Sequence, residues 1–268
     1  MPNASELTIS NNVSILLKAP YKFGKTIAAC SMALDGPIWL AYWDKKEPVE
    51  LLTFFKKSYP ELLKNIDYDV YGAHNANQFL NKLIDMNHRC DYFGIVNDSV
   101  TQMTSSAVNW SLGFRNPKGA RKDKLNPEAI ATIPDWDEYK VETGLVTQSL
   151  DICKNLPCNV IWTCHPLNTI AIDQSSNKIT KGTSIVSYGS KAGSIIPGNF
   201  TEIYHLSLDT SWNSDKGKNE TKRVVNTRSV GDDFAGTSLG LPPELDITDK
   251  LFWQVWKEQV KIAMEKLV

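Results

Sequence analysis

The sequence predicts an α/β fold with a mostly parallel central sheet, flanking helices and an antiparallel C-terminal extension. Three observations indicate this class. Short apolar runs alternate with segments of helical periodicity, which is typical of parallel sheets with crossover helices. The first apolar run leads directly into a Gly-Lys-Thr turn. The length of 268 residues lies near the limit of about 250–300 for one hydrophobic core, so we expect a single domain over residues 1–268.

The order of elements follows from these patterns. Strands are expected at 13–19, 38–42, 68–71, 92–96, 159–163, 201–208 and 222–227, and helices at 26–34, 48–65, 75–86, 99–112, 135–155 and from 248 onward. The last two strands flank a polar turn, which predicts an antiparallel pair. Residues 167–200 are rich in Ser, Thr, Gly and Asn and are expected to form a hairpin or loop. We place the core at 13–230 and a C-terminal extension with an amphipathic helix at 231–268.

Composition and charge exclude several classes of protein. The chain has 29 Lys and Arg against 30 Asp and Glu, a formal net charge of −1, and 42% hydrophobic residues. A disordered chain would combine few apolar residues with a large net charge, and a nonspecific nucleic-acid coat would be strongly basic. Apolar runs break before the roughly 18 residues that a membrane helix needs. With no visible secretion signal, we expect a cytoplasmic protein without a membrane partner.

The cysteines predict reduced thiols. They are Cys30, Cys90, Cys153, Cys158 and Cys164. Their number is odd and their spacing irregular, whereas disulfide frameworks use even numbers. The alternative is a zinc site built from the last three cysteines and His165, although this spacing matches no standard zinc motif.

The strongest motif is a phosphate loop between the first strand and the first helix. The segment Ala19-Pro-Tyr-Lys-Phe-Gly-Lys-Thr26 fits the pattern Ala/Gly-x4-Gly-Lys-Ser/Thr. In such a loop, backbone N–H groups surround phosphate oxygens, the lysine reaches the β and γ phosphates and the threonine hydroxyl holds magnesium. Gly24 permits the tight backbone turn. The residues assigned to ATP and Mg²⁺ binding are Ala19, Pro20, Tyr21, Lys22, Phe23, Gly24, Lys25, Thr26 and Ile27.

Further polar residues follow strand ends at the edge of the sheet where ligands bind in such folds. Asp98 ends an apolar strand and is expected to hold magnesium with Thr26; the alternative is that it caps the next helix. Asp44 and Glu47 follow the second strand, and each is either the base that activates water or a solvated loop acid. His165 follows the 159–163 strand and is a candidate sensor of the γ phosphate. The predicted catalytic set is Lys25, Asp44, Glu47, Asp98 and His165.

A basic cluster lies outside the pattern of the sheet. Its members are Arg115, Lys118, Arg121, Lys122 and Lys124, with one acid, Asp123. Five bases minus one acid give residues 115–124 a local net charge of +4. Lys and Arg neutralise nucleic-acid phosphates by releasing counterions, so this cluster favours nucleic-acid contact. A solvated charged loop is the alternative.

On these motifs the chain resembles the RecA-like ATPases, especially the small phage-encoded members related to RecA and RadA and associated with single-strand-annealing recombination. The resemblance spans residues 13–230. The loop is also similar to that of DnaB-type helicases, with Ala first and a bulky residue before the glycine. The Asn97-Asp98-Ser99 strand end resembles the family's second nucleotide motif. Ile133-Pro-Asp-Trp-Asp-Glu-Tyr139, Leu156-Pro157 and Trp162-Thr-Cys-His165 resemble the phage subgroup.

The resemblance implies DNA binding and assembly. In the family, the stretches after the second motif and after the sensing residue form two DNA-binding loops, here 114–134 and 166–190. This adds Lys178 and Lys181 to the basic cluster as DNA contacts. The family assembles head to tail, with a basic residue completing the neighbour's site, and Lys191 and Arg228 are the candidates here. The implied partners are single-stranded DNA, further copies of the chain in a ring or filament, and an annealing or single-strand-binding protein.

The leading hypothesis is therefore a RecA-fold, Mg²⁺-dependent ATPase that acts on single-stranded DNA in phage-type recombination or replication, in the host cytoplasm. A nucleoside or nucleotide kinase is the first alternative, with residues 115–124 as a basic lid and Asp44 or Glu47 deprotonating the acceptor hydroxyl. The second is a nucleotide-controlled binding module with negligible turnover. The chain departs from the usual loop at Tyr21 and Phe23, where the family carries glycines.

Overall fold

The computed structural model describes residues 12–43, 48–114, 134–172, 178–213, 217–229 and 234–266, with the backbone alone at 168–172, 178–184 and 213. Within these residues an eight-stranded sheet has the order β10-β9-β8-β1-β5-β4-β2-β3. Its strands are β1 (Ser14–Lys18), β2 (Ile38–Tyr42), β3 (Ile66–Val70), β4 (Gly94–Asp98), β5 (Asn159–Cys164), β8 (Glu202–Asn213), β9 (Lys218–Asn226) and β10 (Glu244–Asp246). All neighbours from β8 to β3 are parallel, while β9 and β10 pair antiparallel. The predicted α/β class with an antiparallel C-terminal extension is confirmed.

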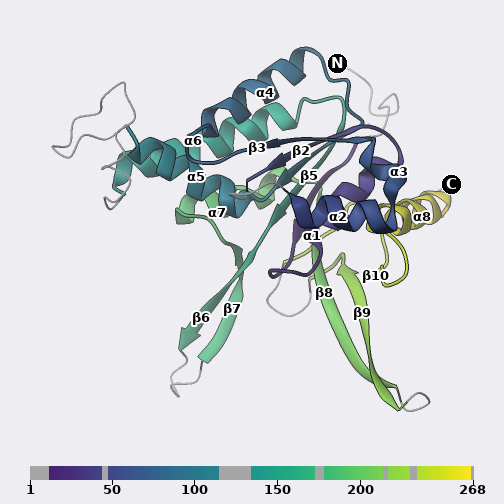
Figure 1. Ribbon diagram of the computed structural model, residues 1–268. Helices are drawn as coiled ribbons and strands as arrows, with labels where there is room; N and C mark the ends of the chain where they lie inside the picture. Colours follow the sequence, from purple (N-terminus) through teal and green to yellow (C-terminus); the bar gives the residue numbers. More distant parts are fainter. Residues whose placement is uncertain are drawn as a thin grey trace, which may run out of the picture.

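Helices cover both faces of this sheet (Figure 1). The helices are α1 (Lys25–Cys30) with its 3-10 continuation η2 (Ser31–Leu34), α2 (Val49–Ser58), α3 (Pro60–Leu63), α4 (Ala76–His88), α5 (Val100–Leu112), α6 (Trp136–Cys153), α7 (Ser190–Ile195), the 3-10 turn η4 (Pro197–Asn199) and α8 (Phe252–Glu265). One core lies under α1, α2, α3 and α8, and a second lies under α4, α5, α6 and α7. Within the described residues, no helix is both long and apolar enough to span a membrane.

The centres of strands β1 and β5 are apolar on both sides because both faces of the sheet are buried there. In β1, Ile15 and Leu17 join the core under α1 while Leu16 joins the core on the opposite face. In β5, Ile161 joins the first core and Trp162 the second. This alternation follows from the two-residue side-chain period of a strand.

The structure corrects several predicted boundaries. The helix expected at 48–65 is two helices, because Pro60 has no N–H and Tyr59 takes a non-helical conformation with φ −149°. The last helix begins at Phe252 rather than 248, since the Thr248 N–H and hydroxyl both bind Oδ1 of Asp246, at 2.9 and 2.6 Å, in a local turn. The strand expected at 92–96 lies at 94–98 and the one expected at 68–71 lies at 66–70.

The C-terminal helix docks onto the helix that follows the phosphate loop. The backbone N–H of Trp253 donates to Oγ of Ser31 at 3.0 Å, and its indole N–H donates to Asp35 at 2.8 Å. The indole of Trp256 stacks on that of Trp253 with centroids 4.7 Å apart and donates to the Tyr204 hydroxyl at 2.9 Å. Helix α8 is therefore part of the core that supports the loop.

Two antiparallel hairpins extend from the sheet and point downward in Figure 1. One is β6 (Pro166–Ile172) with β7 (Lys178–Ile185), which falls within the segment where a hairpin or loop was expected. The other is the outer part of β8 and β9, where Leu208 and Trp212 are exposed.

Candidate functional site

The parallel strands bring the predicted polar residues to one edge of the sheet. Lys18 at the end of β1 lies opposite Cys164 at the end of β5, and Asp98 at the end of β4 lies opposite Tyr42. The phosphate loop leaves β1 at this edge, and the N–H of Trp43, just after β2, donates to the backbone oxygen of Asp98 at 2.8 Å. Ligand sites in open parallel sheets lie at this edge.

The loop backbone turns through two left-handed residues. Lys22 has φ 65° and Gly24, the N-cap of α1, has φ 86°. No side chain among the described residues caps α1, which leaves the N–H groups of its first turn available to an anion.

Aromatic side chains anchor the loop at Tyr21 and Phe23, two positions that depart from a glycine-rich phosphate loop. Phe23 is partly buried against the core under α1. Tyr21 is 65% exposed and stacks on the His165 ring, with centroids 3.7 Å apart and planes at 25°. The departures from the glycine-rich pattern are thus contacts that hold the loop against its surroundings.

The Lys25 side chain folds back into the loop. Its ammonium donates to the backbone oxygens of Ala19 at 2.9 Å and Pro20 at 2.8 Å, and lies 3.2 Å from Nδ1 of His165. These three partners match the three donors of an ammonium. Burial lowers the pKa of Lys25 to about 8, with Asp98 acting in the opposite direction.

Asp98 is held by two threonine hydroxyls from different elements. Thr26 donates to Oδ2 at 2.6 Å, and Thr163 of β5 donates to Oδ1. The cap position of α5 belongs to Ser99, so Asp98 does not cap that helix as the alternative supposed. A buried carboxylate beside a threonine hydroxyl at the end of a phosphate loop fits Mg²⁺, which prefers oxygen ligands and uses one or two carboxylates together with phosphates.

His165 lies between the loop and the segment after β5. The His165 ring contacts Tyr21 and Lys25. Its backbone N–H donates to the Thr101 hydroxyl at 3.3 Å, and its backbone oxygen accepts from the backbone N–H of Val186 at 2.9 Å. Burial, followed by the charge of Lys25, lowers the pKa of His165 to about 4. At neutral pH the ring is therefore uncharged, and Nδ1 accepts from Lys25.

Sequence reasoning missed several residues of this edge. The Thr163 hydroxyl donates to Asp98, and the Thr101 hydroxyl accepts from the backbone N–H of His165. The signal in the sequence was that both threonines lie close to the ends of predicted strands. Lys18 is fully buried beside His205 of β8, and its ammonium contacts both the backbone oxygen and the ring of Phe234. Burial lowers the pKa of Lys18 to about 8 and that of His205 to about 4.

The remaining predicted residues lie outside the described residues, on backbone described without side chains, or on exposed surface elsewhere. Asp44, Glu47 and the basic cluster at 115–124 lie outside the described residues. Lys178 and Lys181 lie on β7, where the backbone alone is described. Lys191 is exposed on α7, and Arg228 is exposed beside a cavity at the base of β8 and β9.

The zinc alternative is wrong for the described residues, which contain no group of three or more His, Cys, Asp or Glu side chains able to hold a metal. The physical reason is the length of β5. Cys158 precedes this strand and Cys164 ends it. Because a strand rises about 3.3 Å per residue, the two cysteines lie roughly 20 Å apart.

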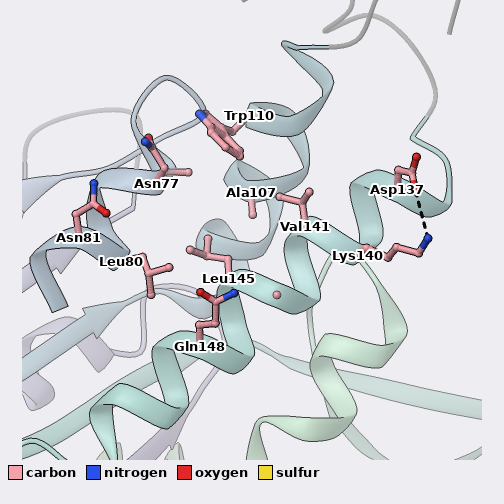
Figure 2. Close-up of a pocket in the computed structure, with 12 residues that line it drawn as sticks. Asn77, Leu80, Asn81, Ala107, Trp110, Asp137, Lys140, Val141, Leu145 and Gln148 are labelled. Atoms are coloured by element: carbon pink, nitrogen blue, oxygen red, sulfur yellow. Dashed lines mark hydrogen bonds and ion pairs between the residues drawn. The ribbon is translucent and has the colours of Figure 1, made fainter. Parts of the chain in front are cut away.

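Cavities lie on the helices as well as near the loop. One of about 600 Å³ lies among α4, α5 and α6, where the amides of Asn77, Asn81 and Gln148 border apolar side chains (Figure 2). A second, of about 660 Å³, lies between α6 and the start of α7 and is lined by Trp136, Tyr139 and Tyr188. A third, of about 240 Å³, borders Gly24 and Ile27 of the loop.

Glu142 lies beside the second cavity and is fully buried. Its Oε1 accepts from the N–H of Gly189 at 2.9 Å, while its Oε2 has no hydrogen-bond partner within the described chain. Burial raises the pKa of Glu142 to about 7. A side chain at position 189 would place Cβ 2.5 Å from Oε2, so glycine is required for this approach. Glu142 thus fixes the return of the β6–β7 hairpin against α6.

No protein-family model matches the chain, and a search of the curated proteins finds no significant match.

Proposed function

We propose that the protein is a Mg²⁺-dependent ATPase whose phosphate site lies between the loop at 19–26 and Asp98. The observation that carries the proposal is the convergence of Lys25, Thr26 and Asp98, from two separate elements, at one edge of the sheet. The Lys25 ammonium exchanges its loop carbonyls for β and γ phosphate oxygens. Thr26 and Asp98 hold Mg²⁺, which supplies charge neutralisation on the phosphates.

We assign the base of the nucleotide to the cavity beside the loop. It borders Gly24 and Ile27 and is also lined by Phe54, Tyr59 and Arg223. Aromatic side chains suit a flat ring, and the guanidinium suits a phosphate or sugar oxygen. Tyr59→Ala is expected to weaken ATP binding much more than the binding of inorganic triphosphate.

His165 is assigned the role of sensor. When Lys25 moves to phosphate, His165 loses its donor and its ring is free to turn toward the γ-phosphate end of the site. Its backbone accepts from Val186 at the end of the β6–β7 hairpin, so a shift of His165 reaches that hairpin. We propose Asp44 or Glu47 as the base that activates water. Both follow Trp43 closely in the chain, and the backbone N–H of Trp43 donates to the backbone oxygen of Asp98.

We further propose a RecA-like fold and binding of single-stranded DNA by the β6–β7 hairpin, the basic cluster at 115–124 and the neighbouring helix ends. Beyond the basic residues, two exposed aromatic side chains support this. Trp136 at the start of α6 is 73% exposed, and Tyr188 after β7 is 45% exposed. Bases of single strands stack on such rings without regard to sequence. Lys140 and Lys191 line the same cavity and supply positive charge.

We also propose, on the resemblance, an assembly and a biological role. The chain assembles into a ring or filament in which Lys191 or Arg228 enters a neighbour's site, and it works with an annealing or single-strand-binding protein in phage-type recombination or replication in the host cytoplasm.

One assay tests the proposed activity. Phosphate release from Mg-ATP is measured with and without single-stranded DNA, for the wild type, for Lys25→Ala and for Lys56→Ala, an exposed lysine on α2. We expect DNA-stimulated release that is lost only in Lys25→Ala. Absence of ATP binding by the wild type would overturn the proposal. Formation of a phosphorylated nucleoside would favour the kinase alternative, and tight ATP binding without phosphate release would favour the binding module.

A further inference from the structure

Two cysteines distant in the sequence meet at the edge of the sheet away from the phosphate loop. Cys90 lies between α4 and β4, and Cys158 directly precedes β5. The two strands are neighbours, and the N–H of Asn159 donates to the backbone oxygen of Phe93 at 3.1 Å. This pairing holds the two connections together, and Cys90 packs against the buried cluster that contains Cys158, close enough for each thiol to shift the pKa of the other.

The two thiols have different surroundings. Cys90 is half-buried and its Sγ also lies 3.7 Å from the backbone oxygen of Tyr92, whereas Cys158 is only 3% exposed. The neighbouring Cys158 thiol lowers the pKa of Cys90, while the Cys90 thiol and burial raise the pKa of Cys158. Cys90 is therefore the more accessible and more acidic thiol of the two, and Cys158 is the buried, less acidic one. Both cysteines are free of disulfides in the structure.

We propose that Cys90 and Cys158 form a peroxide-sensitive dithiol that closes to an intramolecular disulfide. The Cys90 thiolate attacks one oxygen of a hydroperoxide such as H₂O₂, and the O–O bond breaks to leave Cys90 sulfenic acid and hydroxide, which takes up a proton to become water. Cys158 then attacks the Cys90 sulfur, loses its proton and displaces the sulfenic hydroxyl as a second water. In total, two thiols and one H₂O₂ give one disulfide and two waters, so the sulfurs lose the two electrons that the peroxide gains.

The structure also favours Cys90 over Cys153 as the partner of Cys158. Cys153 ends α6 and approaches Cys158, but it is buried and lies in the same connection as Cys158. Only Cys90 comes from a different connection and is partly open to solvent. A Cys90–Cys158 bond therefore ties the α4–β4 connection to the α6–β5 connection, whereas a Cys153–Cys158 bond would close only one turn.

Peptide mapping of the intact protein tests this inference. The wild type is treated with H₂O₂, its remaining thiols are blocked with an alkylating reagent, and the digest is compared with and without reduction. We expect a linked Cys90–Cys158 peptide that is lost in Cys90→Ser and retained in the control Cys153→Ser. Cys158→Ser is expected to trap sulfenic acid on Cys90, detected as a dimedone adduct. The oxidised wild type is expected to unfold at a temperature higher by about 5 °C or more, because the bond restricts the unfolded chain.

Three outcomes would overturn it: a Cys153–Cys158 link, a disulfide between two chains on a non-reducing gel, or a Cys90 that stays fully alkylatable after peroxide. If Cys158→Ser does not fold, the wild type and Cys90→Ser, which changes a half-buried side chain, still decide the question. None of these readouts depends on ATP or DNA.

Discussion

The ammonium of Lys25 lies 3.2 Å from Nδ1 of His165. One residue opens the helix after the phosphate loop, and the other directly follows β5, so the contact joins two elements across the sheet edge. Because Lys25 can only donate, His165 accepts and carries its proton on Nε2. In the proposed ATPase, a phosphate that attracts Lys25 would break this contact, and the pair would then connect phosphate binding to the segment after β5.

The affinity for ATP should fall as the pH rises above 8. Burial holds the pKa of Lys25 at about 8 in the empty site, and phosphate binds the charged form, so binding takes up a proton. At pH 9 the affinity should be about tenfold lower than at pH 7, measured by titration with a fluorescent ATP analogue. Lys25→Arg stays charged and should give a flat profile. A wild-type affinity constant from pH 7 to 9.5 would contradict the assignment.

Stability should fall as the pH drops from 6.5 toward 4. His165 and His205 have pKa values of about 4 in the folded protein, against about 6.5 in the unfolded chain. The unfolded state therefore binds more protons in this window, and the free energy of unfolding decreases with acid. Each histidine should contribute about 1–2 kcal/mol between pH 7 and pH 5, measured by urea unfolding. His165→Asn and His205→Asn should each flatten the curve; an unchanged slope in both would refute this origin.

Gly24→Ala should weaken both stability and ATP binding. No atom lies within 4 Å of a Cβ at this position, so the cost is conformational and comes from φ 86°. A left-handed alanine costs about 1–2 kcal/mol, measurable by denaturant unfolding. Gly198→Ala is the matched control, because a Cβ there is equally uncrowded and no positive φ is required. Equal effects of the two substitutions would disprove the role of the left-handed turn.

Asp98→Asn should remove the response to Mg²⁺. The carboxylate accepts from Thr26 and Thr163, and an amide keeps the shape but loses the charge that attracts the metal. Without Mg²⁺ the transition state would lose several kcal/mol of charge stabilisation, so the rate of ATP hydrolysis should fall by about 100-fold or more. Asp85→Asn, an exposed acid on α4, is the control. Phosphate release that still depends on Mg²⁺ at the wild-type rate would rule out Asp98 as a metal residue.

Trp136→Ala and Tyr188→Ala should each weaken binding of oligo(dT). Stacking of one base contributes about 1–3 kcal/mol, so each change should raise the dissociation constant by roughly 5- to 100-fold. Fluorescence anisotropy with labelled oligonucleotide measures this. Tyr68→Ala changes an exposed aromatic on the edge strand β3, outside this cavity, and should have no effect. If all three variants bind like the wild type, the cavity between α6 and α7 does not hold bases.

Sequence patterns within short segments were enough to predict the fold class and the approximate positions of most strands and helices. Alternating apolar runs predicted the strands, and the loop motif predicted the positions of Lys25 and Thr26, because both depend on neighbouring residues. The contacts of Thr163 and His165 depend on which strands are adjacent, since β5 inserts between β1 and β4, and that order is a tertiary property. The break at Pro60 was available from sequence, as proline lacks the N–H that a continuous helix needs.

The packing of α8 against the helix after the loop affects the order in which parts of the chain can fold during synthesis. Ser31 and Asp35 follow α1, yet their partners Trp253 and Lys257 belong to α8. During synthesis the helix behind the phosphate loop stays uncovered until that late segment leaves the ribosome. The nascent chain therefore exposes apolar surface beside the proposed nucleotide site for most of translation, and this surface is covered only when α8 packs against the helix after the loop.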